Sequence, residues 1–240
     1  MARNILISSP NRRAVLGLGA GAALLAAGFA YRRAGAGSLA ADDGSPIRSF
    51  DAPEPAKLSA LPGLLRQGPA DASVVVLEIF DYNCGYCRQA SADLDRMRKS
   101  DAALGLAFVQ NPMLSPASVQ AALAVVAIGN VFGADAAYAV HRRLLETSGR
   151  ASGESALSAL HAEGLDRARV EGAMAAPETH AVLQAQRDFA SANKLRYTPT
   201  FIMGDTAFIG WPGVPTMTRF AEAVRRCGSP QCPQTGENRG

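Results

Sequence analysis

The sequence predicts an α/β fold in which a mixed sheet is interrupted by an inserted block of helices. Two observations favour it. Apolar runs of strand length lie on both sides of one long segment, and that segment has helical spacing. The resulting order is strand, helix, strand, helical block, hairpin and helix, which is typical of a sheet covered by helices. No internal repeat is present.

The first strand is predicted at Ser73–Phe80, whose apolar residues run almost without a break, as in a strand covered on both faces. The elements that follow are a helix at Gly85–Lys99, a strand at Leu104–Val109, helices from about 115 to 192 with breaks near Gly129–Asn130, Gly149–Gly153, Gly164 and Pro177, a hairpin of Thr200–Met203 and Ala207–Gly210 turning at Gly204–Asp205, and a helix at Val214–Arg226.

An export or anchoring segment is predicted at residues 1–40. Residues 14–31 are uncharged and apolar, and arginine pairs lie on both sides, at Arg12–Arg13 and Arg32–Arg33. The first pair loosely resembles a twin-arginine leader, and small residues around Ser38–Ala41 fit a cleavage site. A charged pair directly after the apolar run is unusual in a cleaved signal, so retention as an inner-membrane anchor stays open. Either way, the chain is predicted to work in the periplasm or outside the cell envelope.

Residues 41–71 are rich in Ala, Gly, Pro and Asp, which predicts a flexible linker with at most a short helix near Leu58–Gln67. The folded domain is then predicted at residues 72–226, followed by a tail at 227–240. No dimerising segment is evident before the domain, so a monomer is expected.

The charge of the folded part excludes a nucleic-acid partner. The formal net charge of the chain is +3, but five of its 24 basic residues lie within residues 1–33. The rest of the chain has 19 basic and 21 acidic side chains. Nucleic-acid binding would need a concentrated basic surface.

Cys84 and Cys87, in the stretch DYNCGYCRQA, are the candidate redox pair. Cys84 is predicted to begin a helix, where unpaired N–H groups and the helix dipole stabilise a thiolate. Cys87 lies one turn later on the same face and would resolve a mixed disulfide. All four cysteines follow the apolar segment, so they are expected in an oxidising compartment.

A metal site and a structural disulfide are the alternatives to a redox pair. A zinc site needs four ligands, and His141, His161 and His180 stand singly, so no metal site is predicted. A static Cys84–Cys87 disulfide would close too short a loop to stabilise the fold much. For Cys227 and Cys232, in RRCGSPQC, a local structural disulfide is the preferred interpretation, and a second redox couple is the alternative.

The stretches VVVLEIFDYNCGYCRQA and YTPTF, with the order of elements, resemble the thioredoxin-fold thiol:disulfide oxidoreductases of the DsbA type. The chain is most similar there to the branch of suppressor of copper sensitivity protein C and Com1-like proteins. The resemblance covers about Ala72 to Val224. It implies a thioredoxin fold, a central mixed sheet flanked by helices, with an inserted α-helical domain.

The resemblance also assigns roles to residues. Cys84 would attack, Cys87 would resolve, and a cis bond after Thr198 would place Pro199 beside the disulfide; alone, Thr198–Pro199 would be an ordinary turn. An extended substrate would then pair with the backbone there. The implied substrate-binding residues are Gly85, Tyr86, Thr198 and Pro199.

Glu78 is a third catalytic candidate, because the resemblance places a buried acid beneath the active site. Such an acid can exchange a proton with Cys87, and burial would raise its pKa. An exposed Glu at a strand edge is the alternative. Some relatives place a basic partner in the following strand, but Val109 and Gln110 occupy that neighbourhood here.

The predicted function is disulfide exchange with cysteine-containing exported proteins, as oxidase or as reductase and isomerase, with no cofactor and with a membrane redox partner that resets the couple. Gly85 and Tyr86 replace the Pro-His pair of strong oxidases, and Thr198 precedes the proline; this combination indicates a less oxidising couple. A thiolate-based module that holds Cu(I) is the alternative function. Trp211 either packs in the core or borders the substrate site.

Overall fold

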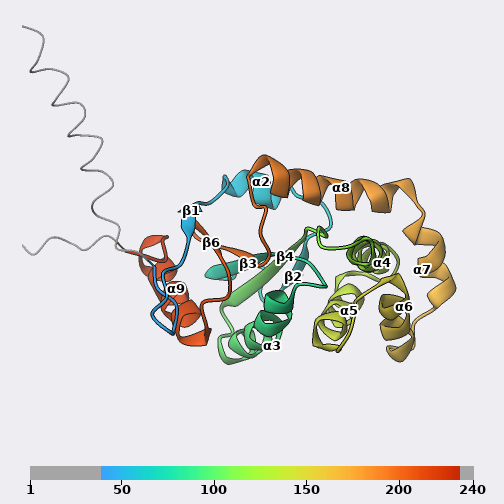
Figure 1. The fold of residues 1–240 in the computed structure, drawn as a ribbon, viewed down its shortest axis with the longest axis horizontal. Coiled ribbons are helices and arrows are strands. Elements are labelled where there is room, and N and C mark those ends of the chain that lie inside the picture. The colour runs from blue at the N-terminus through green and yellow to red at the C-terminus, as the bar shows by residue number, and fades with distance from the viewer. Residues whose placement is uncertain (1–38, 233–240) are drawn as a thin grey trace, which may run out of the picture. The chain divides into compact units, whose positions relative to one another are not determined.

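The structure, a computed structural model, describes residues 39–232, whose six strands form one sheet in the order β1-β6-β5-β3-β4-β2 (Figure 1). Only the β3–β4 pair is parallel. The strands are β1 (Ser49–Asp51), β2 (Leu65–Gln67), β3 (Val74–Phe80), β4 (Leu104–Gln110), β5 (Thr200–Met203) and β6 (Thr206–Ile209). Together with the flanking helices, this sheet confirms the predicted thioredoxin-like α/β fold with a helical insertion.

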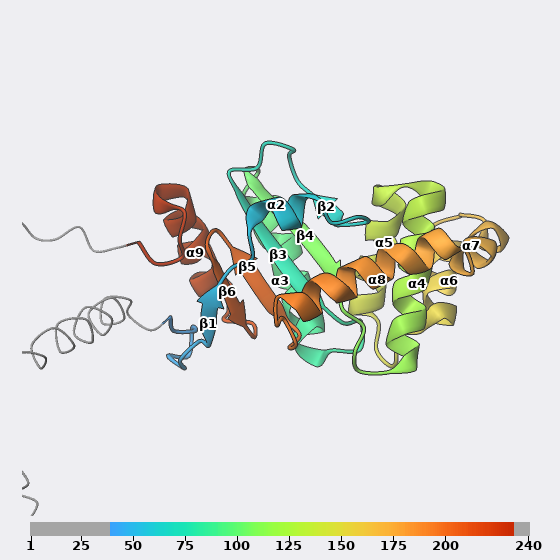
Figure 2. The ribbon, with the colours of Figure 1, turned by 90° about the horizontal axis from the view of Figure 1, so that it is seen from above.

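Helices cover both faces of the sheet. On one face, α3 (Gly85–Ser100) and α9 (Val214–Cys227) pack over apolar side chains of β3 and β4, and α2 (Pro55–Ser59) lies on the opposite face (Figure 1). Figure 2 shows α8 (Pro177–Ala192) running from the helical insertion across that opposite face. The rest of the insertion consists of α4 (Pro116–Phe132), α5 (Ala134–Glu146), α6 (Gly153–Ala162) and α7 (Arg167–Met174).

The two central strands bring the cysteine motif to one edge of the sheet. β3 and β4 are parallel in register from Val74 opposite Leu104 to Phe80 opposite Gln110, so their carboxyl ends share an edge. Both strands are almost entirely buried, as expected when helices cover both faces of parallel strands. The chain leaves β3 at this edge and enters α3 at Cys84.

The helical insertion occupies the segment where the sequence predicts it, but one predicted break is wrong. Helix α4 continues through Gly129 and Asn130 and ends at Phe132. Gly133, with φ of +89°, supplies the left-handed conformation for the turn instead. The packing of α5 does not require a glycine at position 129, since a β-carbon there would lie at an ordinary contact distance of 3.6 Å from the Ala137 side chain.

The prediction of a flexible linker at 41–71 is contradicted by the sheet. β1 pairs with β6 and β2 pairs with β4, so this segment supplies both edge strands. The short helix is α2, ahead of the predicted Leu58–Gln67, whose last three residues are strand β2. Ladder hydrogen bonds use the backbone, which composition does not report, and Leu65 supplies a buried apolar anchor.

The predicted leader at residues 1–40 lies outside the described residues, apart from Leu39 and Ala40. Between residues 39 and 232, no helix is long and apolar enough to cross a membrane. Most of the predicted tail, residues 233–240, also lies outside the described part.

Asp42 attaches the N-terminal segment to α9. Its carboxylate accepts a hydrogen bond from the Thr216 N–H at 2.8 Å, in the first turn of α9, and its own N–H donates to the Pro212 carbonyl at 2.9 Å. The N-cap residue of α9 is Gly213, which has no side chain for this purpose. A β-carbon on Gly213 would collide with the Asp42 carboxylate, so the glycine makes room for a cap from elsewhere in the chain.

We expect Asp42→Ala to lower the free energy of unfolding by about 1 kcal/mol, because the first turn of α9 loses its side-chain acceptor. Urea denaturation would measure this change. Asp43→Ala is the matched control, since Asp43 is exposed and bonds only within its own turn, to Ser45 N–H. Equal losses in the two variants would contradict the capping role.

Candidate active site

Cys84 is the N-cap residue of α3, and its sulfur is surrounded by polar backbone groups. The N–H of Cys87 lies 3.4 Å from Cys84 Sγ, and the carbonyl oxygen of Thr198 lies 3.2 Å from the same sulfur. Cys84 has only 6% of its surface exposed. The arrangement leaves a nearly covered sulfur at the positive end of a helix dipole.

The chain before β5 carries Thr198 to the sulfur. The peptide bond between Thr198 and Pro199 is cis. Pro199 is buried, and its carbonyl accepts a hydrogen bond from Gly210 N–H at 2.9 Å. The structure therefore brings Thr198 beside Cys84 across 114 positions of sequence.

Hydrogen bonds donated to the Cys84 sulfur lower the pKa of its thiol to about 6. The largest cause is a hydrogen bond from the Cys87 thiol, which outweighs partial burial; the Thr198 side chain and the backbone N–H groups of Cys87 and Tyr86 add to the lowering. The thiolate is thus the main form of Cys84 at neutral pH in the reduced protein.

Cys87 and Glu78 form a buried pair below Cys84. Neither side chain has any exposed surface. Burial raises the pKa of the Cys87 thiol far above its ordinary value, and the Cys84 and Glu78 charges raise it further. Burial also raises the pKa of Glu78, and the charge of Cys84 adds to this.

In the part of the chain that the structure describes, no cationic side chain forms an ion pair with Glu78. Neither of its carboxylate oxygens reaches hydrogen-bonding distance of a partner, and the buried side chain of Gln110 is also unpartnered. Gln110, at the end of β4, thus brings no charge to this neighbourhood. An isolated buried carboxylate is strongly unfavourable, so Glu78 is expected to be protonated in the resting state.

Sequence reasoning missed the loop contacts that hold the chain between β3 and Cys84. The buried carboxylate of Asp81 accepts hydrogen bonds from the N–H groups of Asn83, Met113 and Leu114 at 2.7–2.9 Å. Cys84 N–H in turn donates to the Asp81 carbonyl. In the sequence, the only sign of these contacts is an acidic residue directly after a buried strand. Two of its three partners, Met113 and Leu114, come from another loop.

Tyr82 and His141 connect the same loop to α5. The Tyr82 hydroxyl lies 3.2 Å from His141 Nδ1, and the imidazole packs against the rings of Phe108 and Tyr138. Burial lowers the pKa of His141 to about 3, with help from the charge of Arg142, so the ring is neutral. The histidine is a packed core residue.

Exposed apolar side chains lie at the same edge of the sheet as Cys84. Tyr86 is 67% exposed, and Met113, Leu114 and Tyr197 are each at least half exposed. Tyr86 belongs to the cysteine motif, Met113 and Leu114 bond to Asp81, and Tyr197 directly precedes Thr198. These four residues form an apolar rim around the sulfur. Gly85, also exposed, leaves the approach open.

The remaining candidates lie away from this edge or in the core. Trp211 is partly buried and packs against Phe201, with ring centroids 5.6 Å apart. Cys227 and Cys232, at the end of α9, form a disulfide. Within residues 39–232, no cluster of three or more His, Cys, Asp or Glu side chains is arranged to hold a metal ion.

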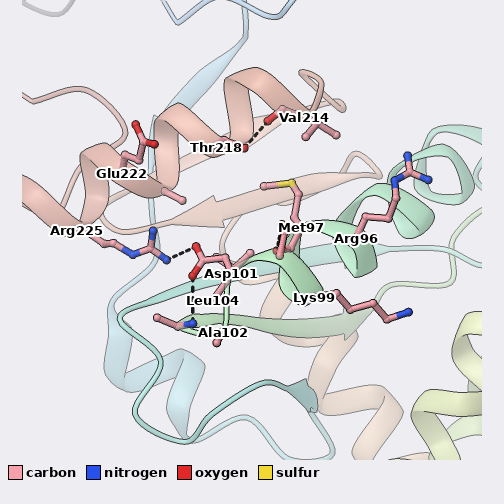
Figure 3. Close-up of a pocket in the computed structure, with 13 residues that line it drawn as sticks. Arg96, Met97, Lys99, Asp101, Ala102, Leu104, Val214, Thr218, Glu222 and Arg225 are labelled. Carbon is pink, nitrogen blue, oxygen red and sulfur yellow. Dashed lines mark hydrogen bonds and ion pairs between the residues drawn. The ribbon is translucent and has the colours of Figure 1, made fainter.

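An open depression of about 1040 Å³ lies between α3 and α9, where Met97 and Val214 border it and Arg225 pairs with Asp101 (Figure 3). Arg96, on its rim, is about 18 Å along the helix axis from Cys84. The depression also includes Leu104, at the opposite edge of the sheet. It is therefore separate from the sulfur site.

Comparisons with known proteins agree with this geometry. The family model described as Thioredoxin matches residues 61–223. A comparison with curated proteins gave no match.

Solved structures share the fold. A thioredoxin-like oxidoreductase from Silicibacter pomeroyi DSS-3 is 28% identical, with 73% of this chain and 99% of that chain covered and a TM-score of 0.65. The thiol-disulfide exchange protein alpha-DsbA2 from Wolbachia pipientis is 21% identical over 70% and 94% of the chains, with a TM-score of 0.63. The catalytic domain of Proteus mirabilis ScsC is 19% identical over 72% and 96%, with a TM-score of 0.64. The chain therefore belongs to the thioredoxin family, and the helical block inserted in its sheet gives it the architecture of the DsbA-type members.

Proposed function

We propose that the protein is an exported thiol:disulfide oxidoreductase that exchanges disulfides with cysteine-containing exported proteins through Cys84 and Cys87. The observation that carries this proposal is the pair of opposite environments in one helical turn. Cys84 is stabilised as a thiolate at the start of α3, whereas Cys87 is buried and protonated. Attack needs the first environment, and resolution of a mixed disulfide needs a second thiol within reach. The relatives named for oxidoreductase and thiol-disulfide exchange activity support it.

In the reductive direction, the Cys84 thiolate attacks one sulfur of a substrate disulfide. A mixed disulfide forms and the other substrate sulfur leaves as a thiolate, which takes a proton from water. Glu78, which is protonated at rest, first releases its proton to water. Its carboxylate then accepts the proton of Cys87, and Cys87 attacks Cys84 Sγ. The Cys84–Cys87 disulfide forms, and the second substrate thiolate is released. The oxidative direction reverses each step, with Glu78 returning the proton to Cys87.

The substrate is proposed to be an extended segment with apolar side chains beside its cysteine. The rim of Tyr86, Met113, Leu114 and Tyr197 supplies apolar surface. We propose that the extended chain pairs with the backbone at Thr198, beside Cys84 Sγ. Each turnover leaves the couple in the opposite redox state, so a second partner must reset it. For an exported chain, we place that partner in the membrane and the protein in the periplasm, as a monomer.

A Cu(I)-holding module is the less favoured function. Two-coordinate Cu(I) would need thiolates at both Cys84 and Cys87. Burial and the Glu78 side chain disfavour the thiolate of Cys87. Retention of one copper per reduced protein, lost in Cys84→Ser, would favour this function over exchange.

The first test is disulfide exchange in both directions, with reduction potential measured in glutathione buffers. The Cys84 pKa of about 6 lies between those of thioredoxin, about 7, and DsbA, about 3.5. We therefore expect a potential between about −270 and −120 mV. Cys84→Ser should abolish exchange, and Cys87→Ser should accumulate mixed disulfides. Wild-type protein that neither reduces nor oxidises a protein substrate would overturn the proposal.

We expect the thiolate of Cys84 to titrate near pH 6, measured by ultraviolet absorbance and by the pH dependence of alkylation. Because this pKa is lowered on folding, the thiolate stabilises the reduced protein fully above the ordinary pKa of about 8.5, and this contribution disappears as the pH falls through about 6. The oxidised protein lacks the contribution. Cys87→Ala keeps the Cys84 thiolate but removes the side-chain donor to it, so its midpoint should lie somewhat higher. A wild-type midpoint near 8.5 would contradict the proposed nucleophile.

We expect Glu78→Gln to slow resolution of the mixed disulfide by roughly 10²-fold, because Cys87 loses its proton acceptor. Attack by Cys84 should change much less. Stopped-flow measurements on wild-type and variant protein would separate the two steps. The amide has nearly the same size as the acid, so a loss of both steps together would indicate a packing role for Glu78.

A further inference from the structure

Asn83, the residue before Cys84, makes every side-chain hydrogen bond to the helical insertion. Its Nδ2 donates to Ser118 Oγ at 2.9 Å and to the Ala151 carbonyl at 3.0 Å, and its Oδ1 accepts from the Ala151 N–H at 2.8 Å. The carboxamide thus pairs with both backbone groups of one residue, as a neighbouring strand would. Neither the sequence motif nor the proposed chemistry assigns Asn83 a role.

The partners of Asn83 are themselves held in place. Ser118 is fully buried in the first turn of α4, and its N–H donates to Ser115 Oγ, the N-cap of that helix. Ala151 is buried and precedes Ser152, which forms a capping box with Ser155 at the start of α6. Asn83 therefore connects the residue beside the sulfur to two helix N-termini of the insertion.

We propose that Asn83 is a positioning residue through which the helical insertion holds the backbone of Cys84, so that the reduced sulfur stays at the N-terminus of α3. The inference rests on the proposed function, because the reaction it adjusts is disulfide exchange. It adds that the insertion controls the redox couple as well as covering it.

The effect is expected to differ between the two redox states. In the oxidised protein, the covalent bond to Cys87 fixes the position of Cys84 Sγ. In the reduced protein, that position depends on the backbone of Cys84, which places the sulfur 3.4 Å from Cys87 N–H. Loss of the Asn83 contacts should therefore weaken the reduced state more than the oxidised state. A contact of equal strength in both states would change stability but leave the potential unchanged.

The test is Asn83→Ala in the full chain, with three readouts: the midpoint of Cys84 titration, the equilibrium constant with glutathione, and the free energy of unfolding of both redox states. We expect the pKa of Cys84 to rise and the equilibrium to favour the oxidised protein by about three- to tenfold, which is about 15 to 30 mV toward a more negative potential. Asp81 and its three N–H partners keep the loop in place, so the shift should be partial.

Two controls separate positioning from general stability. Gln186→Ala removes another buried carboxamide with three hydrogen bonds, to Gln110, Pro62 and Gly63, from the opposite face of the sheet. Asn130→Ala removes a hydrogen bond from the Asn130 side-chain amide to Thr179 Oγ1 inside the insertion. Both should lower stability without shifting the potential. An unchanged potential in Asn83→Ala, or an equal shift in the controls, would overturn the inference.

If Asn83→Ala does not fold, Ser118→Ala provides the second variant. It removes one of the three contacts and keeps the pairing with Ala151, so it should shift the potential in the same direction by a smaller factor. No shift in a folded Ser118→Ala protein would then count against the inference. The wild-type measurements stand apart from these variants: an ordinary pKa for wild-type Cys84 would contradict the proposed function, whereas a lowered pKa that no variant changes would contradict only the role of Asn83.

Discussion

The stabilisation of a thiolate at the N-terminus of α3 is the interaction on which the rest of the site depends. Free N–H groups at a helix start favour negative charge, and here the Cys87 N–H and thiol reinforce that preference at Cys84. The other features place this sulfur. β3 delivers it to one edge of the sheet, and the chain before β5 places Thr198 against it. The four exposed side chains of the apolar rim belong to the chain segments next to this sulfur.

The second constraint is a buried acid without a counterion. A carboxylate as isolated as Glu78 would be unstable in the core, and protonation removes most of that penalty. The protonated acid is then ready to give a proton to Cys87, and its conjugate base is ready to accept one. The cost to stability of placing Glu78 under the cysteines is thus linked to the proton movement that exchange requires.

The helical insertion is closely connected to the catalytic edge. Asn83 and Tyr82, in the loop before Cys84, bond to the insertion through Ser118, Ala151 and His141. Arg88, in α3, donates to the Thr147 carbonyl. The segment before the domain is also part of the fold. Its residues form the edge strands β1 and β2, and Asp42 caps α9.

The sequence by itself determined the fold class, the approximate bounds of β3 to β6, α3 and α9, and the redox pair. These depend on local patterns: apolar periodicity, turn residues and a cysteine spacing that suits a helix start. It also pointed to Glu78, whose charge interrupts an apolar strand. Only the tertiary structure decided how Glu78 is surrounded, that residues 41–71 contribute strands β1 and β2, and that Asn83 and Tyr82 bond to the helical insertion. Such contacts join residues 59 and 68 positions apart, or use backbone groups that every residue carries, so no local pattern encodes them.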